Sequence, residues 1–406
     1  MLSEKNRYKN ILTDIIYIMI IAAIVYVCYV LFGKMMVDHK GGPYWSDLPY
    51  YVGKATDPTA GNHRLPLVLF RFLYSLTGST LAINIYLAAE IGLLFIANYF
   101  YVKCYSGNDT RVHWSRVLIQ FFSIAAVFAG PIYVPRIHDT FYRDTFPTFA
   151  WHSPTQQAMT LFAVLGTLCF FRMLDNYEKK VNPGWWIGSA VFYLLSAYTK
   201  PSFIIDLVPA VVIAFIIELF IKNSLSIGEK FKRLFIMGCS LVPSGVYMLY
   251  LNYYIYQRAE SDGNGDILVD SSKFTGYSHL WIAICCCMAF PLVVMLFNWK
   301  RIFRDGKYRI IILAAIMGLL QWGLLGESGR RASHGNFGWG RVIGGYMLML
   351  TSMAIVADNI RDKEFLGGRK WLRGLYYLML AGTLALHLAS NVYYFVTLCG
   401  GAGYWR

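Results

Sequence analysis

Polar residues that could do chemistry gather in a few short stretches between long apolar runs. The first stretch is Trp45-Ser46-Asp47-Leu48-Pro49. A carboxylate held at a helix start just above a bilayer has the chemistry of a general base. In the alternative, Ser46 or Asp47 is only an N-cap, with Pro49 in the first helical turn. Spacing alone favours the cap, although a cap is also immobilised and the two roles are compatible.

The second stretch, residues 136–157, holds two Arg, two His and two Asp among few residues. Arginine suits bidentate contact with phosphate. Ser153-Pro154-Thr155 predicts a helix start, whose free N–H groups also favour anions. An ordinary solvated loop followed by a helix cap explains the same pattern equally well. The candidate ligand-binding residues here are His138, Asp139, Arg143 and His152.

Two further stretches carry isolated cations. Lys200 follows one apolar run and precedes another, with Asp206 about one turn further on. Its ammonium group could extend to the interface, pair with Asp206 or meet a lipid phosphate. Arg330, Arg331 and Arg341 lie on the side of the membrane that the charge bias assigns to the outside, which favours a phosphate ligand over a decorative role.

These residues must be positioned by membrane helices, because 57% of the 406 residues are hydrophobic and only 15% are charged. A soluble domain has about 25% charged residues, so a soluble enzyme is excluded. The net charge of +14 would suggest nucleic acid in a soluble protein. Here most cations lie in short loops between apolar runs, so topology explains the charge and no nucleic-acid partner is expected.

The apolar runs predict an all-α fold, a single polytopic membrane domain over residues 1–406 with about eleven spans of roughly 20 residues each. The Lys/Arg bias predicts that the N-terminus is inside and the C-terminus outside. The predicted spans lie near 11–32, 80–102, 115–134, 155–173, 184–198, 202–221, 233–256, 279–298, 309–326, 339–357 and 374–396.

The predicted outer loops are 33–79, 135–154, 257–278 and 327–338. Within the first, the apolar stretch 65–76 is too short to span and contains Arg71, so we expect an amphipathic interfacial helix. The run 260–270, with two glycines among its acids, predicts a hairpin or lid. The cysteines lie mostly in apolar segments and show neither a disulfide framework nor zinc-ligand spacing.

Four short patterns resemble those of bacterial cell-surface polysaccharide proteins of the GT-C superfamily of membrane glycosyltransferases. They are Ser46-Asp47-Leu48-Pro49, Trp151-His152-Ser153-Pro154-Thr155, Lys200-Pro201-Ser202 and Gly335-Asn336-Phe337-Gly338-Trp339-Gly340. The resemblance implies a polyprenyl-phosphate sugar donor and a catalytic acid, Asp47, in the first outer loop. It also implies a set of donor-phosphate ligands, which would be Arg143, Lys200, Arg330, Arg331 and Arg341.

On this resemblance His138, Asp139 and His152 contact the sugar or a metal ion. A strict Asp-x-Asp pair is missing, which leaves open the use of a divalent cation such as Mg²⁺ or Mn²⁺. The implied enzyme is an inverting transferase in the bacterial cytoplasmic membrane, with its active site facing outward and a glycan or lipid-linked acceptor. The other classes are a polysaccharide polymerase or ligase, a flippase or secondary transporter with charges at mid-bilayer, and a non-catalytic scaffold.

Overall fold

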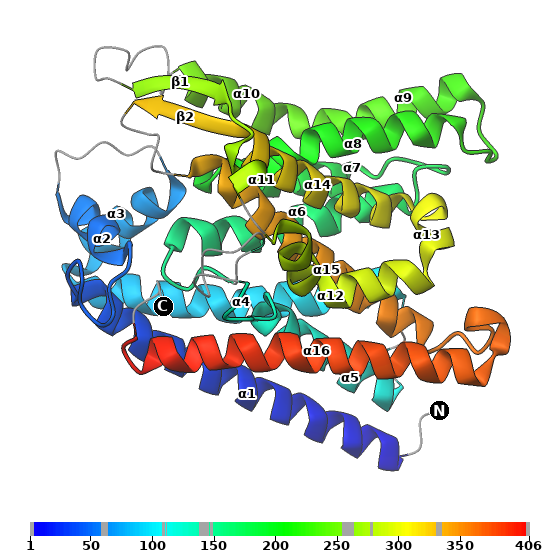
Figure 1. The fold of residues 1–406 in the computed structure, drawn as a ribbon, viewed down its shortest axis with the longest axis horizontal. Coiled ribbons are helices and arrows are strands. Elements are labelled where there is room, and N and C mark those ends of the chain that lie inside the picture. The colour runs from blue at the N-terminus through cyan, green and yellow to red at the C-terminus, as the bar shows by residue number, and fades with distance from the viewer. Residues whose placement is uncertain are drawn as a thin grey trace.

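The computed structural model describes residues 4–57, 64–107, 110, 112–137, 146, 149–253, 264–276, 279–329 and 335–402. These residues form an all-α bundle with one pair of short strands (Figure 1). The elements are α1 Glu4–Val37, α2 Leu48–Thr56, α3 Leu65–Thr77, α4 Thr80–Ser106, α5 His113–Phe128, α6 Pro154–Leu174, α7 Pro183–Thr199, α8 Ser202–Phe220, α9 Ile227–Gly238, α10 Val242–Asn252, β1 Asn264–Val269, α11 Ser272–Gly276, α12 Leu280–Phe297, α13 Trp299–Arg304, α14 Gly306–Leu324, β2 Leu325–Gly329, α15 Trp339–Asn359 and α16 Lys370–Cys399.

Nine helices among the described residues are long and apolar enough to cross a membrane, as a polytopic membrane protein requires. The two other predicted spans fall on shorter helices. The span expected at 115–134 is α5, which has 16 residues and ends at Phe128 before Pro131. The span expected at 184–198 is α7, with 17 residues. A count of eleven crossings therefore stays a prediction.

The two ends of the bundle differ in character (Figure 1). One end carries α2, α3, the β1–β2 pair and the C-terminus, and we call it the α2–α3 end. The opposite end carries the N-terminus and α13, together with the cation-rich connections, and we call it the basic end. The termini thus lie at opposite ends, which is consistent with the topology predicted from the charge bias.

Helix α15 lies at the centre of the bundle and is almost entirely buried. It packs against α14, α4, α5, α12 and α8. Its glycines allow this, because small residues let membrane helices approach closely. A Cβ atom added to Gly344 would lie 2.9 Å from Cα of Ala315 on α14. The contact is therefore backbone against backbone.

Gly344→Ala is expected to destabilise the protein by about 1–3 kcal/mol, because the backbone of α14 must move to admit the methyl group. Gly382→Ala is the matched control, since a Cβ on that helical glycine of α16 meets nothing within 4 Å. It should leave stability unchanged or raise it slightly. Thermal unfolding in detergent measures both, and equal unfolding temperatures for the two variants would contradict the predicted clash.

Helix α12 is broken at Met288, three residues before Pro291. After α5 ends, an extended segment runs alongside this break, and the N–H of Ile132 donates to the carbonyl of Cys286 at 3.2 Å. His387 of α16 bonds the remaining backbone groups near the break. Its Nδ1 donates to the carbonyl of Gly130, and its Nε2 accepts from the Phe290 N–H. His387 is thus a neutral imidazole that satisfies backbone groups within the bundle, where water is scarce.

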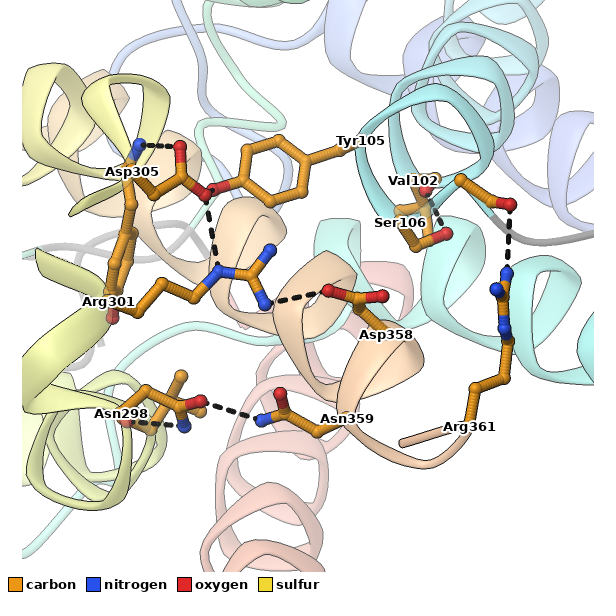
Figure 2. A network of polar contacts seen from close by, with 12 residues as sticks. Val102, Tyr105, Ser106, Asn298, Arg301, Asp305, Asp358, Asn359 and Arg361 are labelled. Carbon is orange, nitrogen blue, oxygen red and sulfur yellow. Dashed lines mark hydrogen bonds and ion pairs between the residues drawn. The ribbon is translucent and has the colours of Figure 1, made fainter. Parts of the chain in front are cut away.

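Polar side chains at the basic end bind one another directly (Figure 2). Arg301 of α13 donates to Asp305 at 3.2 Å and to Asp358 at the end of α15 at 2.8 Å. The hydroxyl of Tyr105 on α4 donates to Asp305 at 2.8 Å. Asn359 donates to Asn298 at 2.9 Å. Because each charge has a direct partner, this network joins α4, α13 and α15 and its role is structural.

The loop predictions for the α2–α3 end are partly confirmed. The stretch 65–76 forms α3, and Arg71 on it donates to the carbonyls of Lys54 and Asp57 at the end of α2, at 3.1 and 2.6 Å. The hairpin expected within 260–270 is wrong in its pairing. Strand β1 of that run pairs antiparallel with the distant β2 instead, because β2 directly continues α14 and offers a free edge.

Candidate functional site

Asp47 lies at the start of α2, where its side chain makes no cap hydrogen bond. The hydroxyl of Ser46 accepts the N–H of Leu48 at 3.2 Å and does the capping. Pro49 lies in the first turn, as the spacing predicts. The prediction that Ser46 or Asp47 starts this helix is confirmed, since Asp47 holds the N-cap position and Ser46 provides the side-chain hydrogen bond. The general-base role of Asp47 stays a prediction. The neighbouring serine leaves the carboxylate available for another purpose.

Lys200 and Pro201 join α7 to α8, and only 9% of Lys200 is exposed. Its ammonium nitrogen lies 3.3 Å from the ring centroid of Trp339, the first residue of α15. An aromatic face stabilises a desolvated cation by a cation–π interaction. The predicted alternative of a pair with Asp206 is wrong, because no ion pair joins the two within the described residues.

Arg64 is the residue immediately before α3, and it is tied to α2. Its guanidinium donates to the hydroxyl of Tyr51 at 3.2 Å. Because α2 and α3 pack together, this bond fixes the arginine near the start of α2. Arg64 and Lys200, the two cations whose charges act on Asp47, come from segments more than a hundred residues apart in the chain.

His152 precedes α6 and is 2% exposed. Its ring centroid lies 6.5 Å from that of Trp339, on the same tryptophan that Lys200 approaches. Burial lowers the pKa of His152 to about 3, with a further contribution from the charge of Lys200. The imidazole is therefore neutral at physiological pH, and it can donate or accept a hydrogen bond without adding charge.

Electrostatics joins these residues into one site, the Asp47–Lys200 cluster, which we define as Asp47, Arg64, His152, Lys200 and Trp339. Burial raises the pKa of Asp47, and the charges of Lys200 and Arg64 oppose that rise. Burial and the nearby Arg64 hold the pKa of Lys200 well below its ordinary value, with Asp47 acting in the opposite sense. The buried Lys200 and the exposed Arg64 together outnumber this one carboxylate, and the excess of positive charge would be stabilised by an anionic ligand.

Among the described residues Asp47 has no ion-pair partner, in contrast to Glu218 and Asp175 at the basic end. At the basic end Glu218 accepts from Arg309 at 2.6 Å, and Asp175 accepts from Lys307 at 2.6 Å. Within the described residues, no such ion pair joins Asp47 to Lys200 or Arg64, although both cations act on its pKa. A purely structural salt bridge would bring the carboxylate and the cation into direct contact. The lack of such contact between Asp47 and either cation favours a ligand that binds between them.

A second carboxylate at this end, Asp206 on the first turns of α8, is fully buried. Neither of its oxygens has a hydrogen-bond partner among the described residues. It lies against the first turn of α15, because a Cβ on Gly340 would clash with its Oδ2. A buried acid without a partner is costly, so Asp206 is a further candidate for function.

The remaining predicted residues divide into two groups. Arg341 lies in the first turn of α15, with its guanidinium 4.3 Å from the ring centroid of Trp322, and its charge helps to lower the pKa of Lys273. It thus lies beside a different lysine from Lys200. The others fall outside the described residues: His138, Asp139, Arg143, Arg330 and Arg331. No group of three His, Cys, Asp or Glu that could hold a metal occurs in the described part of the chain.

Comparison of the chain with known proteins finds no match. Neither known protein families, nor curated proteins, nor solved structures resemble it closely enough to assign a relative. The assignment of a function therefore rests on the geometry of the Asp47–Lys200 cluster.

Sequence reasoning missed two members of this cluster, Arg64 and Trp339. Arg64 stands directly before Leu65-Pro66, a pattern typical of a helix start. A cation at the start of that helix is expected at the same membrane level as Asp47. This expectation could have identified Arg64 from the sequence. Trp339 stood in the last of the four resembling patterns without a role of its own, because only the packing of α15 against α8 brings its ring to Lys200.

Proposed function

We propose that this protein is a membrane glycosyltransferase of the kind found in the GT-C superfamily. It would move a sugar from a polyprenyl-phosphate donor to a cell-surface glycan or lipid-linked acceptor. The observation that carries the proposal is a partly buried Asp47 whose side chain makes no cap hydrogen bond. The charges of the buried Lys200 and of Arg64 both act on its pKa, and no ion pair joins it to either cation among the described residues. A transferase of this kind needs one base and a phosphate-binding group at the same interface.

The chemistry follows from the charges of the cluster. Asp47 takes the proton of the acceptor hydroxyl, and the resulting oxygen attacks the anomeric carbon of the donor sugar. The bond from that carbon to the phosphate oxygen breaks, and the lipid phosphate leaves with the bonding electrons. Lys200 and Arg64 stabilise this departing anion, and the direct displacement inverts the anomeric centre. A raised pKa makes Asp47 a better proton acceptor than an exposed aspartate.

Other residues would complete the site. Arg143, Arg330, Arg331 and Arg341 are proposed as further ligands of the donor phosphate, and His138, Asp139 and His152 as contacts to the sugar or to a divalent cation such as Mg²⁺ or Mn²⁺. Of these, His152 lies in the cluster. The charge bias supports an orientation with the α2–α3 end facing outward. The proposed membrane is the bacterial cytoplasmic membrane, as the resemblance implies.

A polysaccharide polymerase or ligase is the second candidate, and Asp206 favours it. Such an enzyme shares the lipid-linked substrate but need not use Asp47 as its base. Asp206 offers an alternative buried carboxylate beside the start of α15. A flippase or secondary transporter is less favoured. The cavity inside the bundle that Gln156 and Met288 line holds only about 30 Å³, room for one or two waters.

The test is sugar transfer by the full chain reconstituted in lipid vesicles. A polyprenyl phosphate carrying a radiolabelled sugar serves as donor, and envelope glycan or lipid extract serves as acceptor. We expect label in the acceptor fraction, together with stoichiometric release of polyprenyl phosphate. Movement of the intact donor between leaflets without transfer would establish a flippase and contradict the proposal.

A further inference from the structure

A groove of about 540 Å³ lies at the basic end, far from the Asp47–Lys200 cluster. It is formed by the α6–α7 connection, the start of α7 and helix α9 (Figure 1). We call it the α7–α9 groove. Its lining residues are Lys179, Lys180, Val181, Pro183, Trp186, Ile187, Glu229, Lys232, Arg233 and Ile236.

Arg233 and Trp186 give the groove a fixed shape. The Arg233 guanidinium bonds the carboxylate of Glu229 at 2.7 Å and donates to the carbonyls of Tyr177 and Glu178 at 2.8 and 2.5 Å. The indole N–H of Trp186 donates to the carbonyl of Ile236 at 2.7 Å. These bonds hold the α6–α7 connection and α7 against α9, so the lysines on the rim project from an ordered frame.

The rim of the groove carries an uncompensated positive charge. Glu229 is its one carboxylate and Arg233 neutralises it. Lys179, Lys180 and Lys232 are exposed, and no ion pair within the described residues holds any of their ammonium groups. Three cations therefore converge on one hollow, in contrast to the paired charges of the Arg301 network nearby (Figure 2).

The floor and walls of the groove are apolar and open toward the surface that would face lipid. Ile187 and Ile236 line the groove and are exposed, as are Val191 further along α7 and Phe235 beside Ile236 on α9. An occupant with a charged head and an apolar tail fits both features at once. A soluble anion would use only the lysines and leave these apolar side chains uncovered.

We propose that the α7–α9 groove binds the headgroup of an anionic phospholipid from the leaflet at the basic end. The phosphate meets Lys179, Lys180 and Lys232, and the acyl chains lie along Ile187 and Ile236. This site is independent of the proposed transferase activity. Binding of the lipid would anchor the basic end of the bundle in a membrane that contains anionic lipid.

Native mass spectrometry of the full chain, released from mixed micelles, tests the proposal with phosphatidylglycerol and phosphatidylcholine as probes. We expect phosphatidylglycerol to bind at least tenfold more tightly than phosphatidylcholine. The variant K179Q/K180Q/K232Q should lose that preference, because each lysine near an anionic lipid contributes roughly fivefold in affinity. The variant K222Q/K363Q/K370Q is the matched control, since it removes three exposed lysines of the basic end that do not line the groove.

The outcomes separate the groove from general electrostatic attraction and from free phosphate. Retention of the preference by the groove variant, or an equal loss in the control variant, would overturn the proposal. Glycerol phosphate and inorganic phosphate form a second arm, and neither should displace the lipid at a hundredfold molar excess. Displacement by either would show a site for a soluble anion instead. Sugar-transfer activity is not a readout of either arm, so failure here is distinct from failure of the proposed function.

Discussion

Asp47→Asn should abolish sugar transfer while the protein still folds. Asparagine has the same shape but cannot accept the proton of the acceptor hydroxyl. Loss of general-base catalysis costs typically about 10²–10⁴-fold in rate. Folding should survive, because the Asp47 side chain makes no cap hydrogen bond and Ser46 caps the helix. Initial rates of transfer in vesicles and the unfolding temperature in detergent measure the two quantities.

Two further carboxylates provide the comparison for Asp47→Asn. Asp270→Asn is the control, because Asp270 lies at the same end, accepts the N–H of Ser272 at 2.9 Å and is not among the charges that act on the pKa of Asp47. Its transfer rate should stay within about twofold of the wild-type rate. Asp206→Asn tests the second buried acid. An active Asp47→Asn protein beside an inactive Asp206→Asn protein would move the base to Asp206 and favour the polymerase or ligase.

Lys200→Met should lower transfer by about 10²-fold or more without destabilising the fold. Removing one group that stabilises a developing anion in a buried site typically costs about 10²–10³-fold. Stability should stay constant or rise, because methionine relieves the protein of a buried ammonium group near Arg64. A loss of activity accompanied by a comparable loss of stability would instead indicate a structural lysine.

The same variant should change the pH dependence of the reaction. A general base works in its deprotonated form, so activity rises with pH through the pKa of Asp47. Lys200 lowers that pKa against the effect of burial. Its removal should therefore raise the pKa of Asp47 and move the acidic limb of the profile to higher pH. Lys273→Met is the control, since Lys273 donates to the carbonyl of Leu325 and does not act on Asp47. A shift of equal size in both variants would contradict the assignment.

Several features followed from the sequence because their causes are local. Apolar runs of about 20 residues are typical of membrane-spanning helices, so the helices and their approximate positions could be predicted from them. The starts of α2, α3 and α6 carry proline in the first turn, a position that only a helix start tolerates well. The sequence left open whether Ser46 or Asp47 provides the side-chain cap, because both are good cap residues in adjacent positions.

The span count shows where local reasoning ends. Residues 129–134 are apolar and seemed to extend α5, yet they run as an extended segment beside the break in α12. Such backbone is stable within the bundle only because His387, more than two hundred and fifty residues away, satisfies Gly130. Hydropathy reports how apolar a segment is, and it does not report which distant groups will complete its hydrogen bonds.

What the sequence determined by itself is an apolar, all-helical chain with polar residues at the helix ends, because each of these properties depends on a few neighbouring residues. The tertiary structure alone decided which of those polar residues meet. It brought Asp47, Arg64, His152, Lys200 and Trp339 together from five segments, and it closed Glu218 and Asp305 into ion pairs at the opposite end. The physical reason is that burial and Coulomb interaction depend on distance in space. The packing of α15 against its neighbours sets that distance, and the spacing of residues along the chain does not.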